Sequence, residues 1–119
     1  MMDAAAYLGP WLRRGRVDRD ATARREQCAH DALPALVRLL VERFGATRVM
    51  LVGSLRRGTF HRGSDIDLLV EGLTLDAALA AWSETAELAK LPVDLIRTET
   101  LSPKWREHFE RWGQVLYAG

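Results

Sequence analysis

The stretch GSLRRGTFHRGSDIDLLV, residues 53–70, decides how this chain folds and what it does. It follows directly on the apolar run RVMLV, residues 48–52, which predicts a buried strand. At Gly53-Ser54 the chain leaves that strand, and glycine lets a backbone approach a ligand closely. If a helical turn begins near Ser54, its free N–H groups favour an anion at this bend. The bend is therefore a candidate phosphate site.

A second strand is predicted to begin at Asp65, ten residues beyond the bend. Side chains alternate between the two faces of a strand, so Asp65 and Asp67 share one face. Ile66 and Leu68 turn the other way, into the core. A lone pair of carboxylates of this kind often marks only a strand end. Its place after a glycine-serine bend favours a functional pair.

A third carboxylate, Asp94, interrupts the apolar run PVDLI at residues 92–96. If that strand neighbours the pair, Asp65, Asp67 and Asp94 converge. Two like charges about 4 Å apart repel by about 4 kcal/mol at an effective dielectric of 20, so the trio calls for a cation. Oxygen ligands favour magnesium or manganese over zinc. Two such ions would form a clamp for attack at phosphorus.

The remaining pattern predicts a small α/β (α+β) domain. It has one mixed sheet of three to four strands, with helices packed mainly on one face. The helices are expected at residues 18–30, 33–44, 75–88 and 103–112, and the strands at 48–52, 65–70, 93–96 and, as a short edge strand, 114–117. Ser102 is predicted to cap the last helix, with proline at its first position.

Residues 1–119 are predicted to be a single domain, with an N-terminal helical extension at 1–32 and a core at 33–117. Gly9-Pro10 predicts a helix break inside the extension. Arginines gather there, at positions 13, 14, 16, 19, 24 and 25. They form either a solvated helix face or a contact surface for an acidic partner or RNA.

Composition excludes several classes of protein. Hydrophobic residues make up 48% of the chain and charged residues 28%, as in ordinary globular domains. A formal net charge of +1 argues against nucleic acid as the main partner. No apolar run approaches the roughly 20 residues of a membrane span. The single cysteine, Cys28, rules out an internal disulfide and is predicted to be buried or half-buried. We expect a cytoplasmic protein.

The order Gly53-Ser54, ten residues, then Asp65-Ile66-Asp67 resembles the signature of the DNA polymerase beta-like nucleotidyltransferase superfamily. The short chain, with Arg57-Gly58 and Ser64 beside the pair, resembles its minimal nucleotidyltransferases (MNT) over about residues 33–117. Arg56 departs from the family, which usually has a small residue there.

The resemblance implies a nucleotidyltransferase fold and a role for each matching residue. Gly53, Ser54, Arg57 and Ser64 would bind the nucleoside triphosphate. Asp65 and Asp67 would bind both Mg²⁺ ions, with Mn²⁺ as the other candidate. Asp94 would be the third catalytic carboxylate, which ligates the catalytic metal and helps to deprotonate the acceptor hydroxyl.

The resemblance also implies a biological setting. Minimal members are often encoded beside a small helical HEPN-type toxin, and some transfer AMP from ATP to it and so act as antitoxins. We therefore expect an Mg-dependent adenylyltransferase with such a partner. The alternative is a binding module that neutralises the toxin by covering its surface. A homo-oligomer that supplies a substrate lobe for a small molecule stays open.

Several residues outside this set have two interpretations. Trp105, Phe109 and Trp112 form an i, i+4, i+7 stripe that predicts core packing or, if exposed, a partner surface. Trp82 is predicted to lie in the core. His61 and Arg62 are solvated loop residues or close over phosphate.

Overall fold

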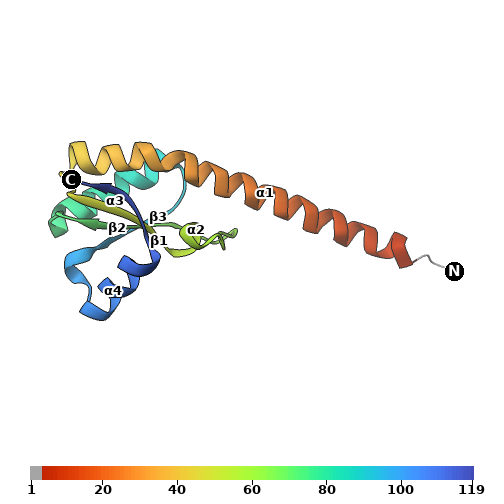
Figure 1. Ribbon diagram of the computed structural model, residues 1–119. Helices are drawn as coiled ribbons and strands as arrows, with labels where there is room; N and C mark the ends of the chain where they lie inside the picture. The colour runs from red at the N-terminus through yellow and green to blue at the C-terminus, as the bar shows by residue number, and fades with distance from the viewer. Residues whose placement is uncertain (1–3) are drawn as a thin grey trace.

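A four-stranded mixed sheet forms the centre of the computed structural model, which describes residues 4–119, with side chains from Arg19 onward. The spatial order of its strands is β3-β2-β1-β4. Helices connect or cover these strands (Figure 1). In chain order the elements are α1 (Ala4–Arg38), a π-helical turn (Leu39–Arg43), β1 (Arg48–Val52), α2 (Gly53–Arg57), β2 (Ile66–Glu71), α3 (Leu75–Ala89), β3 (Val93–Arg97), a 3-10 turn (Thr98–Thr100), α4 (Pro103–Trp112) and β4 (Gln114–Ala118).

Strand directions follow from the connections between them. β1 pairs antiparallel with both β2 and β4, whereas β2 and β3 are parallel. A parallel pair needs a crossover connection, and α3 supplies it. The predicted strands are confirmed within one residue at most ends, and the short edge strand is β4.

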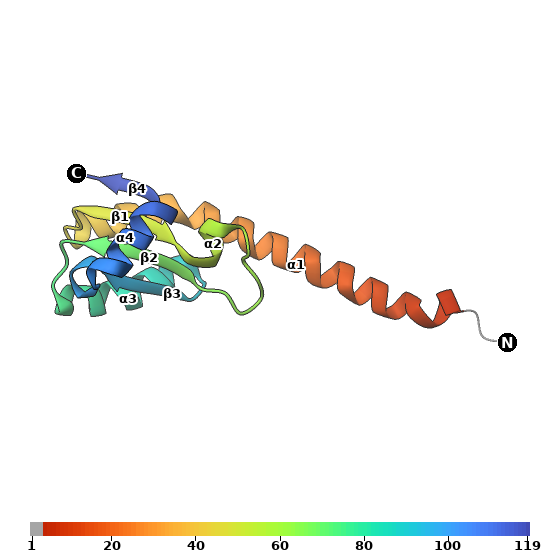
Figure 2. The ribbon, with the colours of Figure 1, turned by 60° about the horizontal axis from the view of Figure 1, so that its bottom comes forward.

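The main core lies between the sheet and the pair α1 and α3 (Figures 1 and 2). Alternate strand residues such as Leu51, Ile66 and Leu68 point into it and are fully buried. From α1, Leu36 and Leu40 meet them. On the opposite face, α4 lies above a smaller cluster of Met50, Val52 and Leu69, against which Phe109 and Leu101 pack. Helices therefore lie mainly on one face, as predicted.

The first helix is longer than predicted. α1 runs without a break from Ala4 to Arg38, so the helix break predicted at Gly9-Pro10 is wrong. Pro10 lacks a backbone N–H, so it removes one hydrogen bond from the helix. The strong helix formers around it compensate for that loss. The predicted boundary between the extension and the core, after residue 32, falls inside α1 and not at the end of a helix or strand. The division therefore stays a prediction.

Two single-residue predictions are also wrong. Cys28 is exposed, because the inward stripe of α1 passes through its neighbour Ala29 and continues to Leu33. Trp82 is 45% exposed, because α3 packs on the sheet through the small residues Ala81 and Thr85. Small contact residues bring the helix close to the sheet and leave its bulky side chains outside.

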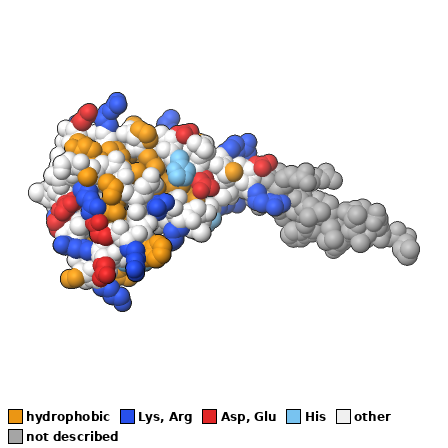
Figure 3. Space-filling model, viewed as in Figure 1, with side chains coloured by type: hydrophobic (Ala, Val, Ile, Leu, Met, Phe, Trp, Pro, Cys, Tyr) orange, Lys and Arg blue, Asp and Glu red, His pale blue; other side chains and the backbone are white. Residues whose placement is uncertain are grey.

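Apolar side chains consequently reach the surface among the charged ones (Figure 3). Those on α3 are Leu75, Leu79, Trp82 and Leu88, and those on α4 are Trp105 and Trp112. None of the helices within the described part of the chain is both long and apolar enough for a transmembrane span.

Candidate functional site

The bend after β1 is built around Gly53. Its φ of +75° lies in the left-handed region that disfavours other residues. A Cβ at this position would lie 2.1 Å from Oδ2 of Asp67, so only glycine fits against that carboxylate. The helical turn expected near Ser54 is present, because α2 starts at Gly53. Ser54 is half-buried on its first turn, next to the Asp67 strand.

The two strand aspartates lie directly beside each other. The parallel register of β2 and β3 pairs Asp67 with Asp94, and the antiparallel register of β1 pairs Asp67 with Val52. Both aspartates belong to the face that α4 covers, opposite the main core. Asp65 is exposed, one residue before β2 begins. The prediction that the strand of Asp94 neighbours the pair is therefore confirmed.

Burial and like charge act together on these carboxyl groups. Desolvation, followed by the charges of Asp94 and Asp65, raises the pKa of Asp67 from 3.8 to about 6. Arg57 partly offsets this rise in the pKa of Asp67. Desolvation, followed by the charge of Asp65, also raises the pKa of Asp94. Carboxylates about 5 Å apart on adjacent strands repel by about 3 kcal/mol at an effective dielectric of 20, which a cation would relieve.

The donor set fits a hard divalent cation. The charges of Asp65, Asp67 and Asp94 act on one another electrostatically. Oxygen donors of this kind suit magnesium or manganese. In the part of the chain whose side chains are described, no three acidic, histidine or cysteine side chains already converge into a closed metal cluster. A cation would therefore have to draw the carboxylates closer.

Two further residues from the predicted set lie on the loop side of the site. Arg57 is exposed at the end of α2, close enough to Asp67 to influence its ionisation. Ser64 is buried, and its Oγ accepts a hydrogen bond of 2.9 Å from the backbone N–H of His61. That bond makes Ser64 a shaping residue of the loop, and no observation places it on a nucleotide.

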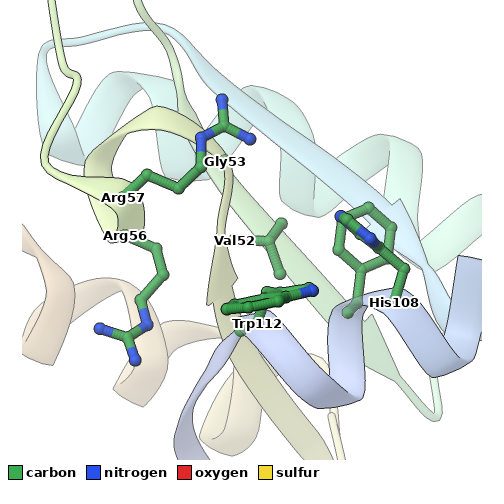
Figure 4. Close-up of a pocket in the computed structure, with 8 residues that line it drawn as sticks. Val52, Gly53, Arg56, Arg57, His108 and Trp112 are labelled. Carbon is green, nitrogen blue, oxygen red and sulfur yellow. The ribbon is translucent and has the colours of Figure 1, made fainter.

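Sequence reasoning missed how the end of α4 meets this site. A cleft between α2 and α4 is lined by Gly53 and Arg56 on one side and by His108 and Trp112 on the other (Figure 4). The exposed aromatic stripe on α4 was the available signal. Nothing in the sequence showed that its end lies beside residue 53, because that contact depends on β4 pairing with β1.

Comparison with known proteins agrees with this geometry. The family model for a nucleotidyltransferase domain matches residues 33–115. A solved structure described as a minimal nucleotidyltransferase is 31% identical, with 80% of this chain and 91% of that chain covered and a TM-score of 0.60. No curated protein matches the chain significantly in sequence.

Two toxin–antitoxin structures are also similar. One, solved with AMP-PNP, is 26% identical over 71% of each chain, with a TM-score of 0.64. The other is a complex of the tri-AMPylated HEPN toxin of Shewanella oneidensis with an MNT antitoxin. It is 20% identical, covers 79% of this chain and 73% of that chain, has a TM-score of 0.56, and supports the fold alone.

Proposed function

Because the chain belongs to the nucleotidyltransferase domain family, we propose that it transfers a nucleoside monophosphate, AMP from ATP foremost, to a hydroxyl group on a partner protein. The observation that carries this proposal is the register of the sheet. It sets Asp67 beside Asp94 and presses Gly53 against Asp67. A carboxylate pair with raised pKa values next to a glycine bend suits a site for cations and phosphate.

Asp65, Asp67 and Asp94 would hold Mg²⁺. The ion supplies positive charge that neutralises the carboxylates and the triphosphate when it is bound. Gly53 lets the backbone of the bend approach Asp67 closely, and the hydroxyl of Ser54 would donate a hydrogen bond to a phosphate group bound at this bend. Arg57 adds a second positive charge near Asp67, consistent with its effect on that carboxyl group.

The reaction balances as a substitution at phosphorus. The acceptor hydroxyl oxygen bonds to the α-phosphorus of ATP, and the bond from that phosphorus to the bridging oxygen of the β-phosphate breaks. Pyrophosphate leaves, and the hydroxyl proton passes to a carboxylate oxygen of Asp94. Loss of that proton makes the hydroxyl oxygen the stronger nucleophile for attack at phosphorus.

A small helical HEPN-type protein is the proposed acceptor, since a similar fold occurs in a complex with an AMPylated toxin of that type. Across residues 4–119 the elements form one sheet with its covering helices, and this described part of the chain contains no second lobe for a small-molecule acceptor. The test is incubation with ATP labelled in the α-phosphate, Mg²⁺ and the helical protein encoded beside it. Label should move to that protein, and Asp67→Asn should abolish the transfer while circular dichroism stays unchanged.

A second candidate function is neutralisation of the toxin by surface occlusion without chemistry. The exposed apolar stripe of α3 favours it, because Leu75, Leu79 and Trp82 are 59%, 56% and 45% exposed. Exposed patches of this kind commonly bind partners. The two functions separate in cells: an Asp65→Asn/Asp67→Asn variant keeps neutralising a toxin that is merely covered, and loses neutralisation where AMP transfer is required.

A further inference from the structure

The cleft between α2 and α4 has a volume of about 490 Å³. Pockets for small ligands run from about 300 to 1,000 Å³, so a nucleoside fits here. We propose that this cleft binds the base and ribose of the nucleoside triphosphate, with the indole of Trp112 as the surface on which a purine stacks. This inference rests on the proposed function and adds a subsite to it.

Position is the first argument. Gly53 lines the cleft and also touches the Asp67 carboxylate, so the cleft opens directly onto the proposed metal and phosphate site. Arg57 lines the cleft and acts electrostatically on Asp67. A triphosphate whose tail meets Asp67 and Gly53 can therefore extend the rest of the molecule into this cleft.

The chemistry of the walls is the second argument. Arg56 and Arg57 supply positive charge on the α2 side, while His108 and Trp112 supply aromatic rings on the α4 side (Figure 4). Neither arginine forms a salt bridge with a described residue. A nucleotide also has two chemically different ends, an anionic phosphate end and a flat aromatic base. Phosphate suits the arginines, and a base suits the rings.

The state of Trp112 is the third argument. Trp112 is 62% exposed, although an indole is among the most costly side chains to leave in water. Its neighbour Phe109 also lines the cleft, but it is packed against the smaller core of Met50, Val52 and Leu69. The last turn of α4 thus carries one aromatic side chain that anchors the helix and another that stands free at the cleft.

Contacts with β1 fix the backbone that carries Trp112. At Gly113 a Cβ would lie 2.8 Å from Cε of Met50 and 3.1 Å from Cγ1 of Val52, so the chain presses directly onto β1 there. One turn earlier, both guanidinium nitrogens of Arg48 on β1 donate to the Glu110 carboxylate. With this backbone fixed, only the side chain of Trp112 has to be ordered when the ligand binds, which limits the entropy cost.

The test compares two probes, ATP with Mg²⁺ and inorganic tripolyphosphate with Mg²⁺, by calorimetric titration. Base stacking on an aromatic side chain contributes about 1–3 kcal/mol by alanine substitution, so Trp112→Ala should raise the Kd for ATP by roughly 5- to 150-fold. The Kd for tripolyphosphate should change less than about twofold, because it has no base. Trp112→Phe should restore most of the affinity for ATP.

Trp82→Ala is the matched control, an exposed tryptophan on α3 that does not line the cleft, and it should bind both probes like the wild type. A second experiment measures the fluorescence of Trp112 and leaves that residue unchanged. A protein whose other tryptophans, at positions 11, 82 and 105, are phenylalanine should show quenching of Trp112 emission by ATP and none by tripolyphosphate.

The inference is overturned if Trp112→Ala binds ATP as the wild type does, or loses both probes equally with its circular dichroism intact. If Asp67→Asn then still abolishes AMP transfer, the proposed function stands and only the cleft assignment fails. If the wild type binds neither probe, both fail together.

Discussion

Gly53→Ala is the most informative single substitution in this chain. The added methyl would lie 2.1 Å from Oδ2 and 2.9 Å from Cγ of Asp67, distances that real atoms do not keep. The carboxylate must therefore rotate away from the bend. Since the backbone of Gly53 also has a φ of +75°, the variant carries a backbone penalty as well as a side-chain clash.

The two penalties can be estimated separately. A non-glycine residue in the left-handed region loses about 1–2 kcal/mol, and reduced freedom of the unfolded chain returns about 0.4–1 kcal/mol. Overpacking at a filled position adds about 1–3 kcal/mol. Gly53→Ala should therefore lower the free energy of unfolding by about 2–4 kcal/mol. Gly45→Ala should lower it by about 1 kcal/mol, because Gly45 has a φ of +77° and nothing within 4 Å of its missing Cβ.

Urea denaturation of the two variants isolates the contact with Asp67. Equal losses for Gly53→Ala and Gly45→Ala would refute the close approach between the bend and the carboxylate. A double-mutant cycle sharpens the result: in an Asp67→Ala background, much of the excess cost of Gly53→Ala should disappear. Labelled ATP provides the functional readout, in which Gly53→Ala should lose at least tenfold in AMP transfer and Gly45→Ala should stay near the wild type.

Three further predictions concern charge. The pKa of Asp67 in the folded state, about 6, lies above its unfolded value of 3.8, so its contribution to stability is complete below about pH 4 and is lost as pH rises through 6. In chelator-treated protein, Asp67→Asn should therefore unfold like the wild type at pH 4 but be more stable at pH 7. Urea titration should show a gain of about 1–2 kcal/mol, discounted for solvent screening of a half-buried group. Arg57→Gln removes the charge that lowers the pKa of Asp67, so carboxyl NMR should show that pKa rising further. Glu110→Gln breaks the exposed pair with Arg48, and its cost should be below about 1 kcal/mol. Because its hydrogen bond with Arg48 lowers the pKa of Glu110, that cost should be present near pH 7 and fade in thermal melts as pH falls below the ordinary glutamate pKa of 4.5.

Much of the fold could be predicted from local pattern. The alternation in DIDLLV gave the two faces of β2 correctly, and Ser102 caps α4 with proline at its first turn as expected. The Ser102 hydroxyl accepts the N–H of Trp105, an interaction that needs only residues three apart. Features of this kind depend on a few neighbouring residues, so one sequence contains them.

Part of the carboxylate site could also be predicted from local pattern. Asp94 stood out because it interrupts an apolar strand, and the crossover through α3 brings that strand beside Asp67. The outward face of α3 could not be predicted, because bulky and small residues both repeat with helical spacing. Which stripe is buried depends on how close Ala81 comes to the sheet, and Trp82 was left outside for that reason.

The cleft at the end of α4 was beyond local pattern altogether. Trp112 meets Gly53 only because β4 returns antiparallel to β1 and brings the preceding helix over the bend. A single sequence contains no pattern that links two residues almost sixty positions apart. Side-chain exposure then decided between the two interpretations of the aromatic stripe, with Phe109 packed inward and Trp105 and Trp112 outside.

A crystal structure with Mg²⁺ and a non-hydrolysable ATP analogue bound would test the carboxylate site most directly. Electron density for a cation touching oxygens of Asp65 and Asp67, with Asp94 beside it and the phosphates against Gly53, is the result that this account predicts. Triphosphate bound away from that bend, with the three carboxylates left facing solvent, would contradict it.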